Sequence, residues 1–597
     1  MNNNSSDSVV TRFPTTWKYV LGAIVTFPFL LLIWLILDLR FLRPELVNID
    51  VETTMDFLRR FSVPLLAVLV LFGGKWLFDF QAAQKREHAW EQKTKQLKEK
   101  ELALATEKAR REYTLEVLGL GITVEQYRQG KLWKVLQEGG AHASIRESDP
   151  KKYPWTELDK MGQTGSRACD ALENGADPSP MFWGVPTMYA SGPIHNLRYQ
   201  PSETAPMAGL AESATGTGMA WHLFVTGPWR LDERPDQLLE QAFAMFDTYP
   251  DLPYLVLLTT SDEMDLDDAQ PPGNPSRIQT GYYIPEYPDT SVVFVLARRE
   301  RVEPLRPYIW EDRDNDYLQE NLRYMYIALK KALAPPHGPD SLFGGPRQPT
   351  IAEWLPAAAA FAKRPVFDHK DGTLLDTFKR WTSHPPKDWK PTPWFPVPWN
   401  RNQMEAFDRL PSLGFVHRPV FVKFEDEHGQ PVKHRDARQK ILEAGWQQAL
   451  QTLPEAERSK GASRIIAAFD NNTEHLIALE GLLHHYAKQG GPEIDSGKTA
   501  QFINTDRRMG NTGAATFFVQ MAVGVMGSYI DGGPSAAINL RDPSGASLVF
   551  ISPPSEEKRV AQGENVFKHM VEPSIDPENY AQPALPVDTA QAEPVAN

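Results

Sequence analysis

Two long apolar stretches dominate the first eighty residues. Residues 19–37 (YVLGAIVTFPFLLLIWLIL) hold no charge, and at about 1.5 Å of rise per residue a helix of this length nearly covers a hydrocarbon core. Residues 61–80 are apolar except near their end, where the stem of Lys75 can reach outward to water. We therefore predict two transmembrane helices within residues 19–80. The alternatives are a cleavable signal peptide for the first stretch and a core helix of a soluble domain for the second.

The polar pattern changes after residue 80. Residues 81–116 predict one long charged helix, in which Glu91 and Lys95 form an i,i+4 pair of the favourable orientation. Only one position of each heptad is apolar, so a solvated stalk is favoured over a coiled coil. Gly119 and Gly121 are expected to end this helix.

Flanking charge predicts the orientation of the two spans. The loop 38–60 holds five acidic residues and four arginines, whereas residues 81–100 hold six Lys/Arg and three glutamates. Because positively charged flanks stay in the cytoplasm, we place both the N-terminal tail, residues 1–18, and everything after the second span there.

Beyond residue 123, short apolar runs alternate with helical spacing, which predicts the α/β fold class. The expected strands are 221–227, 254–260, 291–297, 418–424, 463–469 and 547–552. The expected helices are 235–247, 315–334, 437–452 and 475–487.

One pattern occurs twice. The string TSVVFVLARRE begins at Thr290 and ASLVFISPPSE begins at Ala546, each within a similar order of strands and helices. This repetition predicts two related α/β domains, residues 117–380 and 411–570, that arose by duplication. The alternative is that apolar core strands resemble one another in any α/β fold.

A proline-rich strap, residues 381–410, separates the two predicted domains. Its prolines forbid regular helix, and Trp389, Trp394 and Trp399 recur every five residues. Such a strap either offers tryptophan anchors to a partner or packs them on its own domains as an ordered linker. Residues 571–597 are acidic and rich in Pro and Ala, which predicts a disordered tail.

Composition excludes several function classes. The net charge of −13 argues against nucleic-acid binding, and the single cysteine excludes a disulfide scaffold and a Cys-rich zinc site. The sequence lacks G-x-S-x-G, a phosphate-binding P-loop and H-E-x-x-H. We therefore assign no catalytic, cofactor-binding or metal-ligating residue and no small-molecule substrate, and expect a protein that is not an enzyme.

An acidic segment follows the strand expected at 254–260. It resembles a calcium loop in charge alone, because the glycine and the closing glutamate of that pattern are missing. We predict a solvated acidic loop or a dock for a basic partner surface. Its acidic residues are Asp262, Glu263, Asp265, Asp267 and Asp268.

Three strings resemble the family of type VI secretion lipase adaptors. They are GMAWHLFVTGPW (218–229), SRIIAAFDNNTEHLIALEGLLHHYA (463–487) and the glycine-rich stretch 512–555. The resemblance implies a non-enzymatic protein of Gram-negative bacteria that binds a phospholipase effector in the cytoplasm and helps load it onto the secretion spike protein. With the two predicted spans, the expected location is the inner membrane. The alternatives are a membrane-anchored, hydrolase-like enzyme with an unrecognised active site and a membrane-bound scaffold or receptor.

Overall fold

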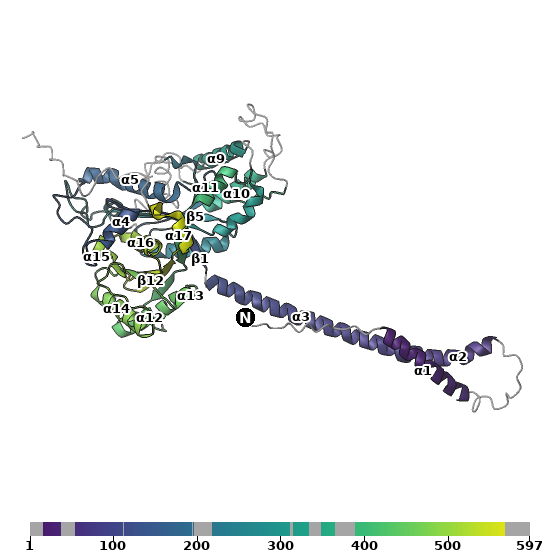
Figure 1. Cartoon of the computed structure of the whole chain (residues 1–597). Helices are drawn as coiled ribbons and strands as arrows, with labels where there is room; N and C mark the ends of the chain where they lie inside the picture. The colour runs from purple at the N-terminus through teal and green to yellow at the C-terminus, as the bar shows by residue number, and fades with distance from the viewer. Residues whose placement is uncertain are drawn as a thin grey trace, which may run out of the picture. The chain divides into compact units, whose positions relative to one another are not determined.

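The structure is a computed structural model. It describes residues 16–37, 54–111, 113–193, 195, 218–310, 315–332, 348–363 and 388–567 (Figure 1). Residues 1–15 and the predicted tail 571–597 lie outside these ranges. The chain forms two compact units, Met1–Arg110 and Arg111–Asn597.

The N-terminal unit is helical. Helix α1 spans Thr16–Leu37, and a second run passes without a break through α2 (Thr54–Val68), the π-helical turn η2 (Leu69–Gly73) and α3 (Gly74–Arg111). Helices are therefore confirmed where both spans and most of the stalk are predicted. Among the described residues, three helices are long and apolar enough to cross a membrane, and the third, Gly513–Asp531, is buried inside the second unit.

The helix that we predict for residues 81–116 ends earlier than expected. Helix α3 stops at Arg111, and strand β1 occupies Thr114–Val124. Gly119 and Gly121 therefore lie within a strand and do not cap a helix. A Cβ at Gly121 would lie 1.8 Å from the carbonyl oxygen of Ala171, so these glycines let a helix backbone approach the sheet.

One sheet runs through the second unit, in the order β10-β9-β11-β12-β7-β1-β6-β5-β3-β4. Two further strands lie off this path, where β2 pairs with β1 and β8 pairs with β12. The first-half strands are β1 Thr114–Val124, β2 Tyr127–Arg128, β3 Gly184–Ala190, β4 Leu223–Arg230, β5 Tyr254–Ser261 and β6 Thr290–Ala297. The second-half strands are β7 Gly414–His417, β8 Val420–Lys423, β9 Arg464–Ala468, β10 Phe502–Asn504, β11 Ser535–Asn539 and β12 Gly545–Ser552.

The two halves of the sheet have the same strand arrangement on either side of the antiparallel pair β1–β7. From this centre outward, the first half runs β1, β6, β5, β3, β4 and the second β7, β12, β11, β9, β10. In each half the first two neighbouring pairs are antiparallel and the outer two are parallel. Strands β6 and β12, which contain the repeated sequence pattern, occupy equivalent places.

Helices cover the sheet and complete two cores. The larger core takes residues from both halves and from the strap, while the smaller one lies within the second half. The main helices are α4 Gln129–Gln137, α5 Glu157–Ala176, α7 Leu238–Thr248, α9 Asn315–Ala332, α10 Ile351–Ala362, α11 Arg401–Arg409, α12 Arg435–Leu450, α14 Thr473–Lys488 and α16 Thr516–Asp531. Short ones are η4 Met219–Trp221, η5 Pro235–Gln237, α8 Glu263–Ala269, η6 Arg299–Tyr308, α13 Glu455–Arg458, α15 Thr505–Met509, η8 Gly513–Ala515, α17 Glu556–Gln562 and η9 Glu564–Phe567.

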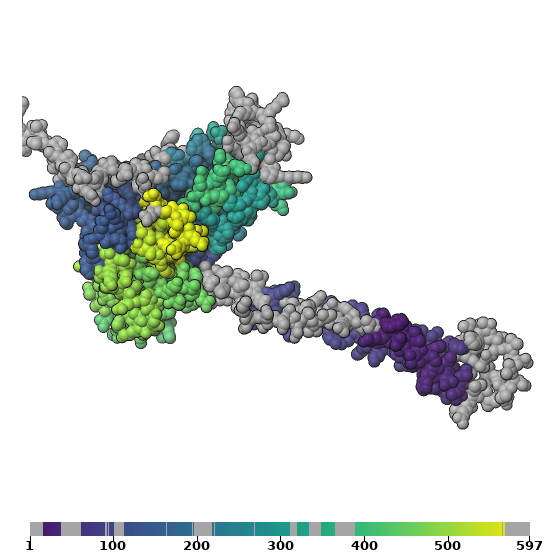
Figure 2. All heavy atoms as spheres, in the orientation of Figure 1, coloured from purple at the N-terminus to yellow at the C-terminus, as the bar shows by residue number. Residues whose placement is uncertain are grey.

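The α/β class is confirmed, and each of the six expected strands coincides with a strand of the sheet. The sequence reasoning missed β1, β2, β3, β7, β10 and β11 and the central helix α16. In the view of Figure 2, the last described residues (yellow) lie between surfaces of the first half and of the second. Because the halves share a sheet and a core, the boundaries of the two predicted domains stay predictions.

Candidate functional site

The acidic segment lies where strand β5 gives way to helix α8. Asp262 is buried and caps this helix, since its carboxylate accepts a hydrogen bond from the backbone N–H of Asp265 at 2.7 Å. Burial raises the pKa of Asp262, and the capping hydrogen bonds act in the opposite direction. Asp262 and Asp265, two residues of the predicted dock, are therefore the N-cap and part of the first turn of helix α8.

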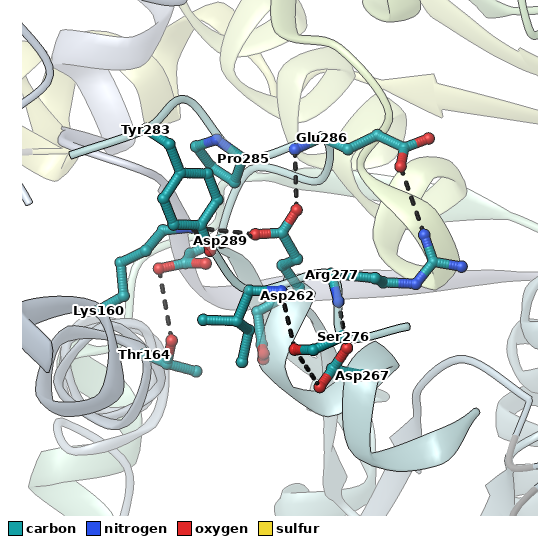
Figure 3. Close-up of polar contacts among 12 residues, drawn as sticks. Lys160, Thr164, Asp262, Asp267, Ser276, Arg277, Tyr283, Pro285, Glu286 and Asp289 are labelled. Atoms are coloured by element: carbon teal, nitrogen blue, oxygen red, sulfur yellow. Dashed lines mark hydrogen bonds and ion pairs between the residues drawn. The ribbon is translucent and has the colours of Figure 1, made fainter. Parts of the chain in front are cut away.

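Glu263 is the acceptor in a buried cluster with Lys160 and Tyr283, the two members of this cluster that Figure 3 labels. Its Oε2 lies 3.3 Å from Lys160 Nζ and accepts the Tyr283 hydroxyl at 2.8 Å. Burial lowers the pKa of Lys160, against the attraction of Glu263. Burial and the hydrogen bond to Glu263 raise the pKa of Tyr283. The Lys160 and Glu263 side chains are only 2% and 4% exposed, so the pair ties α5 to α8 inside the fold.

Asp267 holds the loop that follows α8. Its carboxylate accepts hydrogen bonds from the backbone N–H of Arg277 at 2.5 Å and from the Ser276 hydroxyl at 3.0 Å (Figure 3). Further along this loop, the backbone N–H of Glu286 donates to Glu263 Oε1 at 3.0 Å. Carboxylates that we predict to face a partner thus accept hydrogen bonds from the loop that follows α8.

A second group of buried charges lies beside the first. Arg167 of α5 forms an ion pair with Asp289 and donates from Nε to the backbone oxygen of Glu125 at 3.2 Å. The Arg167 guanidinium also stacks 4.5 Å from the ring centre of Trp155. Burial is the main cause that lowers the pKa of Arg167, to about 10. Glu125 itself has a φ of 48°, which is uncommon for a residue that is not glycine.

The sequence reasoning missed every basic partner in these two groups. Lys160 and Arg167 are seven residues apart and therefore share one face of α5, and this spacing was the available signal. Asp265 and Asp267 are half-buried, and the side chain of Asp268 lies outside the described residues.

The tryptophans of the strap pack on the first half of the fold. Trp394 and Trp399 are buried, and Trp389 is partly buried. The ring of Trp399 lies 6.2 Å from that of Trp183 and 5.6 Å from that of Phe395. These contacts match the ordered linker, which was the alternative to partner anchors.

Two family models match the chain. The model described as type VI lipase adapter protein Tla3, N-terminal, matches residues 113–280, and the model described as type VI lipase adapter protein Tla3, C-terminal, matches residues 413–553. They cover 168 and 141 residues, which together are 309 of the 597. The chain belongs to the Tla3 family of type VI lipase adapter proteins. The family that the sequence strings resembled is thereby confirmed.

The two Tla3 models follow the architecture of the sheet. The N-terminal model begins just before β1 and ends in the loop that Asp267 and Glu263 hold, and the C-terminal model spans β7 to β12. Helices α9, α10 and α11 and the strap lie outside both matches.

Solved structures similar to this Tla3-family chain include ketosynthases. The oxazolomycin ketosynthase domain OzmH KS8 of Streptomyces albus JA3453 shares 8% identity over 74% of this chain and 96% of that one, with a TM-score of 0.35. The 3-oxoacyl-[acyl-carrier-protein] synthase III of Aquifex aeolicus VF5 shares 8% identity over 73% and 99%, with a TM-score of 0.30. Such low TM-scores carry no argument about function.

The described residues of this adapter include one arrangement that bears on the enzyme alternative. His417 Nδ1 lies 2.8 Å from the carbonyl oxygen of Thr452, and its Nε2 lies 2.8 Å from the hydroxyl of Ser552. This is the spacing of a nucleophile and its base. Ser552, however, is only 4% exposed, and its Oγ also lies 2.5 Å from Glu457 Oε2. Within the part of the chain that the structure describes, no group of three or more His, Cys, Asp or Glu could hold a metal ion.

Proposed function

We propose that this protein is a non-enzymatic adaptor that binds a type VI phospholipase effector in the cytoplasm and helps load it onto the spike protein of the secretion machine. The observation that carries this proposal is the match of both Tla3 adapter models, one to each half of the sheet. The acidic segment is consistent with it, because its described carboxylates pair with or hydrogen-bond to the chain's own residues.

We also propose that the N-terminal unit anchors the adaptor in the inner membrane. Thr16–Leu37 and Phe61–Arg86 are long and apolar enough to span it. The two runs lie in contact, since a Cβ at Gly22 would lie 2.6 Å from the Phe72 ring, and the Tyr19 hydroxyl donates to Asp79 at 2.5 Å. Large apolar side chains such as Val25 and Phe78 face outward, as lipid contact requires. The positive flanks favour a cytoplasmic location for the rest of the chain.

We further propose that the two halves arose by duplication. Their strands follow the same chain order from centre to edge and the same sequence of antiparallel and parallel pairs. This similarity extends over five strands of each half, whereas the repeated sequence string covers only β6 and β12.

The adaptor proposal is tested by purifying the tagged full-length chain in detergent from the native host. Co-purifying proteins are then identified by mass spectrometry. Recovery of one lipase-like effector in near-equal amount, together with a spike protein, is the expected result. A chain that purifies without any lipase, from cells that express one, would overturn the proposal.

A further inference from the structure

An aromatic–arginine surface lies on the first half, away from the buried acidic cluster. It consists of Met181, Phe182, Trp221, Arg323 and Tyr324, which come from the segment before β3, from η4 and from α9. The guanidinium carbon of Arg323 lies 3.8 Å from the ring centre of Trp221, and the rings of Trp221 and Phe182 lie 4.9 Å apart. Three segments far apart in the sequence therefore build one stack.

The backbone under this stack is held in an unusual conformation. Phe182 has a φ of 63°, which is a genuine outlier for a bulky residue, and its N–H donates to the carbonyl oxygen of Trp221 at 2.9 Å. The preceding carbonyl, that of Met181, accepts a hydrogen bond from Gln403 Nε2 at 2.5 Å. Residues held in such conformations cluster at functional sites.

The outer residues of the surface remain accessible. Met181 is 40% exposed and Tyr324 is 52% exposed, although both side chains are large and apolar in part. They flank Phe182 and Arg323 in the chain, so accessible apolar area adjoins the stacked guanidinium.

Arg323 differs from the other stacked arginines. Within the described ranges, the structure gives it no hydrogen bond and no ion pair, and its Nε is buried without a partner. The other arginines that stack on rings each have a polar partner; for instance, Arg299 pairs with Glu116 and Arg418 with Glu240. A guanidinium that already stacks on a tryptophan and lacks a partner is suited to bind a carboxylate through two parallel hydrogen bonds.

We infer that this surface is where the effector docks, with a carboxylate of the effector on Arg323 and an apolar side chain against Met181 and Tyr324. The inference rests on the proposed adaptor function. It follows from the composition as well as the geometry, because Trp, Tyr, Arg, Phe and Met are enriched in the cores of protein interfaces. The acidic segment at 262–268 then has no part in cargo binding, since its described carboxylates serve the fold.

The test uses the full-length chain, purified in detergent, and the lipase-like effector that co-purifies with it. Arg323→Glu places a carboxylate opposite the one expected on the effector, and Tyr324→Ala removes exposed area. We expect affinity to fall about tenfold or more for each variant. The matched controls are Arg507→Glu on α15 and Ile477→Ala on α14, both exposed and both expected to bind as the wild type does.

The outcomes separate the two proposals. If the wild type recovers the effector and both surface variants bind it within twofold of the wild type, the docking inference is wrong and the adaptor function stands. If the wild type recovers no lipase, the adaptor function itself fails. Should Arg323→Glu unfold, as judged by circular dichroism, the decision passes to Tyr324→Ala and Met181→Ser, which leave the stack in place.

Discussion

The two halves of the sheet share a topology but differ in the helices that cover them. In the first half, α5 packs on β1 and β6 and brings the charged residues Lys160 and Arg167 into the interior. In the second half, α16 packs on β9, β11 and β12, and fourteen of its sixteen residues are buried and almost all apolar. Its buried amide, Gln520, donates to the backbone oxygens of Ile466 and Ile538.

This difference shows which features of an α/β half can vary. The order of strands is the same in both halves, so it does not depend on whether the covering helix is charged. The charges of α5 fix α8 and the loop after it. In the second half the corresponding buried charge is Asp506 of α15, which pairs with Arg541 and accepts the backbone N–H groups of Phe469 and Asp470. Burial of apolar residues accounts for the strand order that the halves share, and the buried Lys160–Glu263 ion pair links helix α5 to helix α8 in the first half.

The largest expected effect comes from breaking the buried pair of the first half. Lys160→Met leaves the Glu263 carboxylate buried beside an apolar side chain, which costs about 3–5 kcal/mol of unfolding free energy. Chemical denaturation followed by tryptophan fluorescence measures it. Lys134→Met is the control, because its pair with Glu138 is exposed and its loss should lie within experimental error. Equal effects of the two substitutions would show that the buried cluster does not stabilise the fold.

Acid should weaken the second half through His417. Burial lowers the pKa of His417 to about 4, whereas an unfolded histidine titrates near about 6.5. Between these values the unfolded state binds the extra proton, so stability falls as the pH drops from 6.5 to 4, by up to roughly 3 kcal/mol. Denaturation midpoints at pH 7.5, 6 and 5 measure this slope. His417→Gln should flatten it. Burial also lowers the pKa of His222 in the first half. His222→Gln is therefore the matched substitution, and it measures how much of the slope comes from the first half.

A pair of glycines compares the helix packing of the two halves. Gly121→Ala directs a methyl group at the backbone oxygen of Ala171, so α5 must move and the cost is about 1–3 kcal/mol. A Cβ at Gly524 of α16 would meet side-chain atoms and no backbone: Ile551 Cδ1 at 3.0 Å, Ser535 Cβ at 3.4 Å and Ile466 Cδ1 at 3.6 Å. There the gain in helix propensity, up to about 1 kcal/mol, offsets the crowding. Thermal unfolding measures both variants. A larger loss of melting temperature in Gly524→Ala than in Gly121→Ala would contradict this comparison of the two helix packings.

The smallest expected effect is on hydrolysis. Ser552→Ala should leave the turnover of short p-nitrophenyl esters by the purified chain at background, because Ser552 is buried next to His417. Wild-type turnover that disappears in Ser552→Ala would support the enzyme alternative.

The sequence predicted the apolar elements better than the polar ones. The six expected strands follow from short runs of apolar residues, which the core of the fold buries. The helices of the N-terminal unit begin with long apolar runs. Strand β1 was missed because the charged helix before it continues almost to Thr114, and α16 because it is apolar all round and has no helical stripe. Order along the chain would match strand 254–260 with strand 463–469, whereas the place of 254–260 in the sheet corresponds to that of β11.

The candidate site was predicted only in outline. The acidic residues at 262–268 were found as a cluster, but their partners Lys160 and Tyr283 lie 20 to about 100 residues away and form no motif. The stack of Phe182, Trp221 and Arg323 likewise depends on tertiary contacts between distant segments. Such contacts are not encoded in local spacing.

The central pair β1–β7 also has a consequence for synthesis of the chain on the ribosome. Thr114 pairs with His417 across the middle of the sheet. At about 5–20 residues per second, β7 emerges roughly 15–60 s after β1. During that interval Thr114–Val117 of β1 have no neighbouring strand on this edge and are open to pairing with other chains. A nascent or truncated first half would therefore depend on chaperones until the second half arrives.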